Sequence, residues 1–325
     1  MKSTQEITLE VQQLGRWIPT LREQVSHVVV GQKYLVDRLL LGLLANGHIL
    51  LEGVPGLAKT LTVKTLAAAI HTGFQRLQFT PDLLPADLIG TLIYNPRTGE
   101  FSTKLGPIFS NLILADEINR APAKVQSALL EAMQERQVTI GEQTYPLSDP
   151  FLVLATQNPI EHHGTYPLPE SQLDRFILRI GMGYPSRDSE REIMEQHSSG
   201  RNAAAEVRPV MEADEVEVMQ RAVEKVRVDN SLRDYALDIV ERTRNSEQLT
   251  LGVSPRGVLM LQRAAQARAY LEGRDYCTPD DFKQLVMPVF AHRVVVNTRY
   301  AATQKKSTQA EMVLREIIEA TPVPL

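Results

Sequence analysis

Short apolar segments alternate with longer stretches of helical periodicity through the first half of the chain. Each segment is four to six residues long and is bounded by polar or turn-forming residues, which is typical of a buried strand. Buried strands that alternate with helices favour an α/β fold, in which a mostly parallel sheet is flanked by helices on both faces. The five predicted strands cover residues 48–51, 74–79, 112–115, 151–155 and 176–180.

Two helices beside the first strand have clear apolar faces. The helix predicted over residues 34–44 places Val36, Leu39, Leu40 and Leu43 on one face and ends at Asn46-Gly47, which supplies a left-handed cap. The second follows residue 60, and we expect Gly73 to close it. Two further segments, residues 92–104 and 138–147, predict β-hairpins, which from the residues alone are best interpreted as surface decoration.

The second half of the chain predicts a smaller, all-helical domain. The pairs Ser254-Pro255 and Thr278-Pro279 each place a capping residue before a first-turn proline, and Thr308 with Glu311 predicts a capping box for a last helix to about residue 320. We therefore predict three parts. An α/β domain with two hairpin inserts covers residues 1–190, a connector 191–212 and a helical lid 213–325.

Composition indicates an ordinary globular protein. Of the 325 residues 43% are hydrophobic and 23% charged, and the net charge of −4 provides no broad basic face for nucleic acid. The longest apolar run, residues 38–52, is too short to span a bilayer and is interrupted by Asn46-Gly47. Cys277 is the only cysteine, so no intramolecular disulfide can form. We expect a cytoplasmic protein with no membrane contact.

A phosphate-binding loop connects the first predicted strand to its helix. Glycines allow successive backbone N–H groups to face an anion, and the helix that follows adds its positive N-terminal end. Lys59 would then reach the β and γ phosphates of ATP, and Thr60 would hold Mg²⁺ through its hydroxyl. Ala58 replaces the usual glycine, and we expect it to crowd the phosphates slightly while favouring the helix. The nucleotide-binding residues are Gly53, Val54, Pro55, Gly56, Leu57, Ala58, Lys59, Thr60 and Leu61.

Two carboxylates end the third predicted strand, about sixty residues after this loop. Asp116 is placed to hold the Mg²⁺ shell. Glu117 is placed to orient and polarise a water molecule for in-line attack on the γ phosphate. Together the two motifs predict an enzyme that hydrolyses ATP to ADP and phosphate.

The chain resembles the AAA+ ATPases and, within them, the MoxR family, over nearly its whole length. The segments that carry the resemblance occur in the order GVPGLAKT, LILADEINRAP, ATQNP, GTYPLPESQLDRF and GVSPRG. The resemblance implies that Asn158 is a sensor of the γ phosphate. It also implies that Arg175 is an arginine finger that reaches a neighbouring subunit, and that Arg256 is a second sensor, which would place the nucleotide between the two domains.

Each of these residues also has a structural interpretation. Asn158 precedes a proline and could form a turn, and Arg175 could pair with Asp174 or Glu170. Arg256 lies in the first turn of a predicted helix, where the helix dipole disfavours a cation, so either a phosphate or an acidic neighbour must compensate.

The resemblance further implies a homo-oligomeric ring, expected to be a hexamer, that remodels or matures a client protein, with von Willebrand factor A domain proteins as possible partners. The two hairpins resemble inserts that face the central pore of the ring in this branch of AAA+ proteins. Other interpretations are a metal-chelatase or nucleic-acid motor subunit and a scaffold that binds nucleotide without turnover. The acidic net charge argues against nucleic acid, and the presence of Glu117, Asn158 and Arg175 argues against the scaffold.

Overall fold

The computed structural model describes residues 15–53, 57–157, 165–198, 206–297 and 306–324. Its centre is a five-stranded sheet in the order β2-β5-β8-β1-β9, in which every neighbouring pair is parallel. All five predicted strands are confirmed. Their bounds are β1 His48–Glu52, β2 Phe74–Gln78, β5 Leu112–Asp116, β8 Leu152–Gln157 and β9 Phe176–Gly181.

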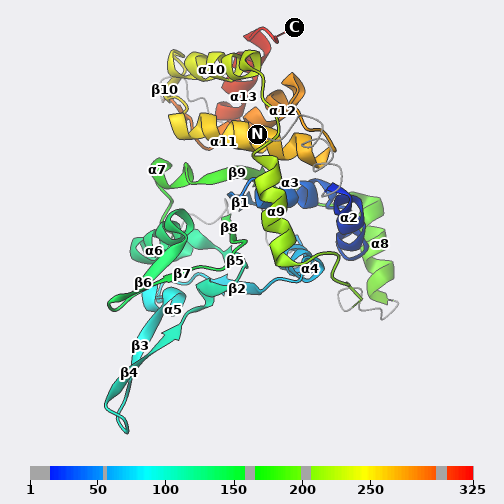
Figure 1. Ribbon diagram of the computed structural model, residues 1–325. Coiled ribbons are helices and arrows are strands. Elements are labelled where there is room, and N and C mark those ends of the chain that lie inside the picture. The colour runs from blue at the N-terminus through cyan, green and yellow to red at the C-terminus, as the bar shows by residue number, and fades with distance from the viewer. Residues whose placement is uncertain (1–14, 54–56, 158–164, 199–205, 298–305, 325) are drawn as a thin grey trace.

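Successive residues of the central strands are buried on opposite faces of the sheet. Ile49 and Leu51 belong to one apolar cluster and Leu50 to the other, and all three are fully buried. This two-residue alternation explains why the strands read as continuous apolar runs, since both faces are covered. In Figure 1 the helices lie on either side of the sheet.

On the first face, α3 (Lys33–Leu44) and α4 (Lys59–Ala69) pack against the strands, and α2 (Trp17–Val28) and α9 (Ala213–Val223) pack against those helices. The second face packs against α5 (Pro85–Ile89), α6 (Ala123–Glu135) and the short 3₁₀ turns η1 (Pro107–Phe109) and η2 (Ile118–Arg120). The left-handed cap at Asn46 is confirmed by its φ of 50°. The expectation that Gly73 closes α4 is wrong, because the helix ends at Ala69 with Ile70 as its C-cap, and His71 then takes the left-handed conformation with φ 47°.

Two antiparallel hairpins interrupt the α/β order where the sequence predicts them. The first pairs β3 (Gly90–Asn95) with β4 (Glu100–Leu105), and the second pairs β6 (Gln137–Ile140) with β7 (Gln143–Pro146). A hydrogen bond of 2.8 Å between the Thr103 and Tyr145 hydroxyls joins them. Figure 1 shows that β3–β4 projects away from the body of the molecule.

The lid is built from α10 (Asn230–Arg244), α11 (Pro255–Leu271), α12 (Pro279–Phe290) and α13 (Lys306–Ala320). It is helical as expected, with one addition, a short antiparallel pair of β10 (Leu249–Leu251) and β11 (Val295–Val296). The Ser254 cap is confirmed, because its side chain accepts from the N–H of Gly257. The capping role of Thr308 is wrong, because α13 has already begun at Lys306. Before the lid, α8 (Arg187–Ser198) extends into the predicted connector.

A buried ion pair joins the lid to the sheet. Arg293, whose side chain is 1% exposed, donates to the Asp174 carboxylate at 2.8 Å, and Ser254 donates to the other oxygen of that carboxylate at 3.0 Å. His292 lies 2.9 Å from the carbonyl oxygen of Phe176, at the start of β9. Burial lowers the pKa of Arg293 to about 10, and the Asp174 carboxylate opposes this shift. The lid is therefore fixed to the segment that leads into β9.

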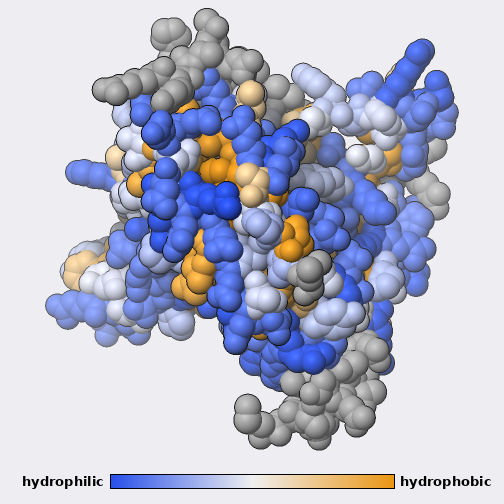
Figure 2. All heavy atoms as spheres, turned by 90° about the horizontal axis from the view of Figure 1, so that it is seen from above, coloured by the Kyte–Doolittle hydropathy of each residue, from blue (hydrophilic) through white to orange (hydrophobic). Residues whose placement is uncertain are grey.

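None of the helices in the described residues has the length and apolar character needed to cross a bilayer. Figure 2 shows that the face seen from above is mostly hydrophilic, with apolar residues in small groups among polar ones.

Candidate functional site

A cavity of about 470 Å³ opens at the carboxyl ends of the central strands. This is the edge at which open parallel α/β sheets bind their ligands. Strands β2, β5 and β8 contribute residues, and the rest come from the turn after β5, the loop before α4 and the first turn of α4. The described lining residues are Gly53, Leu57, Ala58, Lys59, Thr60, Leu61, Arg76, Gln78, Asp116, Glu117 and Thr156.

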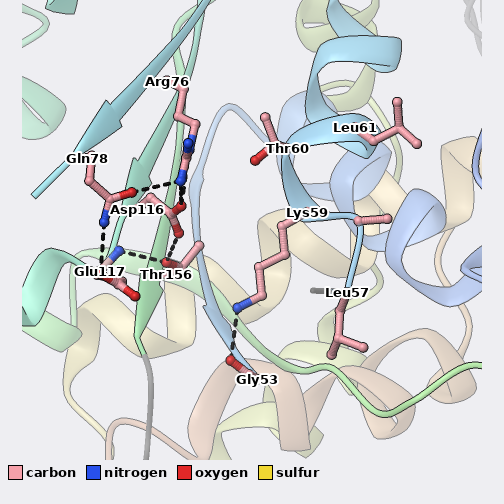
Figure 3. Close-up of a pocket in the computed structure, with 11 residues that line it drawn as sticks. Gly53, Leu57, Lys59, Thr60, Leu61, Arg76, Gln78, Asp116, Glu117 and Thr156 are labelled. Atoms are coloured by element: carbon pink, nitrogen blue, oxygen red, sulfur yellow. Dashed lines mark hydrogen bonds and ion pairs between the residues drawn. The ribbon is translucent and has the colours of Figure 1, made fainter. Parts of the chain in front are cut away.

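Lys59 and Thr60 begin α4 at the cavity wall. In Figure 3 the Lys59 ammonium group points toward the loop and donates to the carbonyl oxygen of Gly53 at 2.9 Å. Burial lowers the pKa of Lys59, while the carboxylates of Asp116 and Glu117 raise it. The first N–H groups of α4 lie at the same wall, so the helix N-terminus and Lys59 together form a site for an anion.

Ala58 does not act as the sequence analysis expects. It is the N-cap of α4 in the left-handed conformation, with φ 55°, and is not part of the helix. A Cβ atom in this region costs about 1–2 kcal/mol, which explains why glycine is usual here. The loop therefore needs a left-handed residue just before Lys59, whichever side chain it carries.

Asp116, at the end of β5, is held by two neighbours. Arg76 donates two hydrogen bonds to Asp116 Oδ2, at 2.6 and 3.1 Å, and Thr156 donates to Oδ1 at 2.7 Å. The Arg76 side chain lies on β2, the strand beside β5. Both carboxylate oxygens of Asp116 are thus oriented by residues that line the cavity.

Glu117 follows Asp116 in the left-handed conformation, with φ 58°. Its N–H donates to the Thr156 hydroxyl at 2.8 Å, so that one hydroxyl links both acidic residues. Its carboxylate accepts from Gln78 at 2.8 Å and from Arg120 at 2.9 Å. Figure 3 shows the contacts among Arg76, Gln78, Asp116, Glu117 and Thr156 as one continuous network on the side of the cavity that faces Lys59. The turn and its partners therefore set where the Glu117 carboxylate lies.

Arg76, Gln78 and Thr156 were missed by the sequence analysis. A signal existed, because Arg76 and Gln78 are two residues apart in a strand and so share one face. Two polar side chains on one face of a predicted strand could have indicated a site. Thr156 is 1% exposed, and it reads in the sequence as an ordinary strand residue.

The cavity fits a nucleotide with Mg²⁺. Thr60 and Asp116 supply oxygen donors, which suit Mg²⁺, and this ion is usually held by one or two carboxylates together with substrate phosphates. In keeping with that, no group of three or more His, Cys, Asp or Glu side chains that could hold a metal is found in the described ranges. Val54, Pro55, Gly56 and Asn158 lie outside the described residues, so their predicted roles stay predictions.

Arg175 and Arg256 line a second cavity, of about 350 Å³. Asn46, Gly47 and His48 line the same cavity, which places it at the amino end of β1. The loop with Lys59 leaves the carboxyl end of that strand. Five residues at roughly 3.3 Å each separate the two edges by about 16 Å. The structure therefore does not bring Arg256 to the first cavity, where the sequence analysis expects it.

Arg175 does not form the ion pair that was its structural alternative. Its guanidinium donates to the carbonyl oxygen of Leu130 at 2.7 Å, and its Nε is buried without a hydrogen-bond partner. Asp174 instead pairs with Arg293. Arg175 also directly precedes β9, and the first residue of β9 pairs with His48 at the amino end of β1. Arg175 therefore cannot reach the phosphate-binding loop of its own subunit, which follows the carboxyl end of β1.

The chain is similar to known ATPases over most of its length. Residues 48–178 match the model of the ATPase family associated with various cellular activities (AAA), and residues 241–317 match the AAA lid domain. The chain is 46% identical over 303 residues to the uncharacterized protein YeaC of Bacillus subtilis, covering 93% of each chain. It is 45% identical over 310 residues to Chaperone MoxR1 of Mycobacterium tuberculosis, covering 93% of this chain and 81% of that protein.

A solved structure from Cytophaga hutchinsonii, described as a candidate ATPase, superposes with a TM-score of 0.89 at 45% identity. The match covers 99% of this chain and 98% of that one. A parallel sheet with a phosphate loop, a strand ending in two carboxylates and an attached helical lid define an ATPase of the AAA+ class. Within that class, the chain belongs to the MoxR family.

Proposed function

We propose that this protein is a Mg²⁺-dependent ATPase that works as a ring of six subunits in the cytoplasm. In this proposal, hydrolysis drives chaperone-like remodelling or maturation of a client protein. The observation that carries the proposal is the separation of the two cavities. The residues for binding and attack line one edge of the sheet, whereas the predicted arginine finger lies at the other.

Within one subunit, Lys59 and the N-terminus of α4 would hold the phosphates, and Thr60 and Asp116 would hold Mg²⁺. The ion would neutralise charge on the β and γ phosphates when bound. Glu117 would accept a hydrogen bond from the attacking water and polarise it. Its hydrogen bonds to Gln78 and Arg120 orient the carboxylate before that step.

A ring would complete the site. Arg175 can serve a nucleotide only if an adjacent subunit presents its first cavity to the amino edge of this sheet. A subunit placed head to tail does so, and repetition of that contact closes a ring. Arg256 lines the same cavity as Arg175, so we propose that it contacts the neighbour's nucleotide as well. Bound ATP would then link subunits and promote assembly.

The client role depends on relatedness rather than on the site. A relative that shares 45% identity is named a chaperone, and resemblance to the MoxR family implies partners with a von Willebrand factor A domain. The β3–β4 hairpin projects from the body and exposes Tyr94 and Phe101, whose side chains are 53% and 66% exposed. Such a surface is suited to contact with another protein.

One variant tests the proposed role of Glu117. Glu117→Gln is expected to bind ATP normally in calorimetry and to abolish hydrolysis, because it removes the group that polarises water while retaining its shape. Wild-type turnover in this variant would refute the role of Glu117. In the presence of ATP, the Glu117→Gln protein should also retain its client, which a pull-down would then recover.

A mixing experiment tests the shared site. Lys59→Ala and Arg175→Ala should each be inactive alone, the first for want of bound nucleotide and the second for want of the finger. Mixed in equal amounts, they should recover activity at about one quarter of the sites, where an intact loop meets an intact finger. Mixed proteins that stay inactive would show that Arg175 acts within its own subunit.

A further inference from the structure

The second cavity is strongly cationic. Four arginines line it, and its described lining includes no carboxylate. Two of them, Arg175 and Arg256, already have roles in the proposed function. The other two are Arg136, which follows α6, and Arg263, in the middle of α11.

These four side chains differ in how far their own chain satisfies them. Arg136 donates to the backbone and side-chain oxygens of Asn46 and to the backbone of Phe151, and burial lowers its pKa. Arg175 has one bond to the Leu130 carbonyl and a buried Nε without a partner. Arg256 and Arg263 are exposed and make no hydrogen bond or ion pair within the described part of the chain. Arg136 is therefore structural, and Arg263 remains to be explained.

Helix geometry places Arg263 on the same face of α11 as Arg256. The two residues are seven apart on α11, which is two turns, and Leu259 and Met260 between them line the same cavity. Arg263 also borders a neighbouring cavity that contains Asp149, Glu217 and Glu224. No described ion pair of 4.0 Å or less joins it to any of these carboxylates, so its charge is available to a ligand.

Arginines gathered at one cavity repel one another, and this raises the free energy of the folded chain where no ion pair offsets it. The positive charge of Arg256 acts in this direction on Arg293, whose pKa is lowered mainly by burial and in smaller part by Arg256. A bound polyanion would offset this cost, and guanidinium groups suit phosphate oxygens, which they bind in pairs of hydrogen bonds.

We propose that Arg263 contacts the triphosphate bound by the adjacent subunit and forms, with Arg175 and Arg256, one phosphate-binding surface. This inference rests on the proposed function, because it requires the ring. It extends that function by adding a cation from the middle of α11, two turns from the predicted sensor.

The test uses the full-length protein with Glu117→Gln as the parent, so that Mg-ATP persists during the measurement. Sedimentation velocity gives the ATP concentration at which half of the parent assembles. Arg263→Ala in this parent should raise that concentration about 10- to 100-fold, as expected for loss of a hydrogen bond to a charged group. Arg263→Lys should fall between the parent and Arg263→Ala, because it retains the charge and loses the paired hydrogen bonds of the guanidinium group.

Arg315→Ala is the matched control, because Arg315 is also an exposed helical arginine of the lid and lines no described cavity. It should assemble like the parent. Calorimetry on dilute, unassembled protein should give the same ATP affinity for Arg263→Ala and the parent. A weaker affinity there would place Arg263 in its own subunit's site and overturn the proposal.

The outcomes distinguish failure of the Arg263 proposal from failure of the proposed ring. If the parent itself does not assemble in Mg-ATP, the ring is wrong and the role of Arg263 fails with it. If the parent assembles and Arg263→Ala assembles at the same ATP concentration, only the role of Arg263 is overturned.

Discussion

Replacing Thr156 with valine would remove one hydroxyl group and leave the shape of the side chain almost unchanged. That hydroxyl accepts from the N–H of Glu117 at 2.8 Å and donates to Asp116 at 2.7 Å. Because Thr156 is 1% exposed, water cannot easily replace it. Thr156→Val should therefore leave a donor and an acceptor unsatisfied and lower the free energy of unfolding by about 1–3 kcal/mol.

The effect on catalysis should exceed the effect on binding. The Glu117 backbone is held in the left-handed region, and the hydroxyl is the partner of its N–H. Without that bond the carboxylate loses its fixed position, and a misplacement of about 1 Å lowers kcat roughly 10- to 100-fold. ATP affinity should change little, because Lys59 and the loop are untouched.

The assay combines steady-state ATP hydrolysis, calorimetry with Mg-ATP and urea unfolding. Thr156→Ser is the matched control, since it retains the hydroxyl and loses a methyl group, at a cost of about 1 kcal/mol in stability. It should hydrolyse ATP at near the wild-type rate. The reasoning is refuted if Thr156→Val retains wild-type kcat, or if the serine variant loses as much activity as the valine variant.

Two further predictions concern stability. Asp174→Ala should lower the free energy of unfolding in urea by about 3–5 kcal/mol, because it leaves Arg293 buried without a counter-ion; the double variant Asp174→Ala/Arg293→Met should recover part of this loss, and an unchanged urea midpoint in the single variant would contradict the role of the pair. Burial lowers the pKa of His48 to about 3, from an ordinary value of 6.5. As the pH falls, His48 therefore takes up its proton in the unfolded chain at a higher pH than in the folded chain. The free energy of unfolding should decrease as the pH drops from 6.5 toward 3, by about 2 kcal/mol at pH 5 relative to neutral pH. His48→Gln should show a shallower fall, and equal slopes would refute the assignment.

The sheet could be predicted from the sequence because its signals are local. Each strand is a short apolar run whose residues are buried on both faces, as Leu50 and its neighbours are. The motifs at Lys59 and at Asp116-Glu117 could be assigned for the same reason, since one turn sets the position of each. The cap at Ser254 likewise depends on one side chain and the next few N–H groups.

What could not be predicted depends on contacts between distant segments or on backbone conformation. The positions of Arg76 and Gln78 against the acidic residues follow from the pairing of β2 with β5, which are far apart in the chain. The left-handed conformation of Ala58 is not encoded by alanine itself, which ordinarily favours helix. It is imposed by the turn from β1 into α4.

The separation of the two cavities could not be predicted without the strand order of the sheet. A resemblance can assign Arg256 to a nucleotide, but it cannot say which subunit holds that nucleotide. Only the parallel pairing of β1 with β9 places Arg175 level with His48 and away from the phosphate loop.

The ion pair between Asp174 and Arg293 has a mechanical consequence for the proposed ring. Asp174 directly precedes the finger residue, and Ser254, which shares its carboxylate, caps the helix that carries Arg256. A swing of the lid must therefore drag Arg175 along or pull a buried charge pair apart. In the proposed ring, the lid and Arg175 of one protomer would therefore move together, so that a shift of the lid at one active site would be transmitted to the phosphates bound by the next protomer.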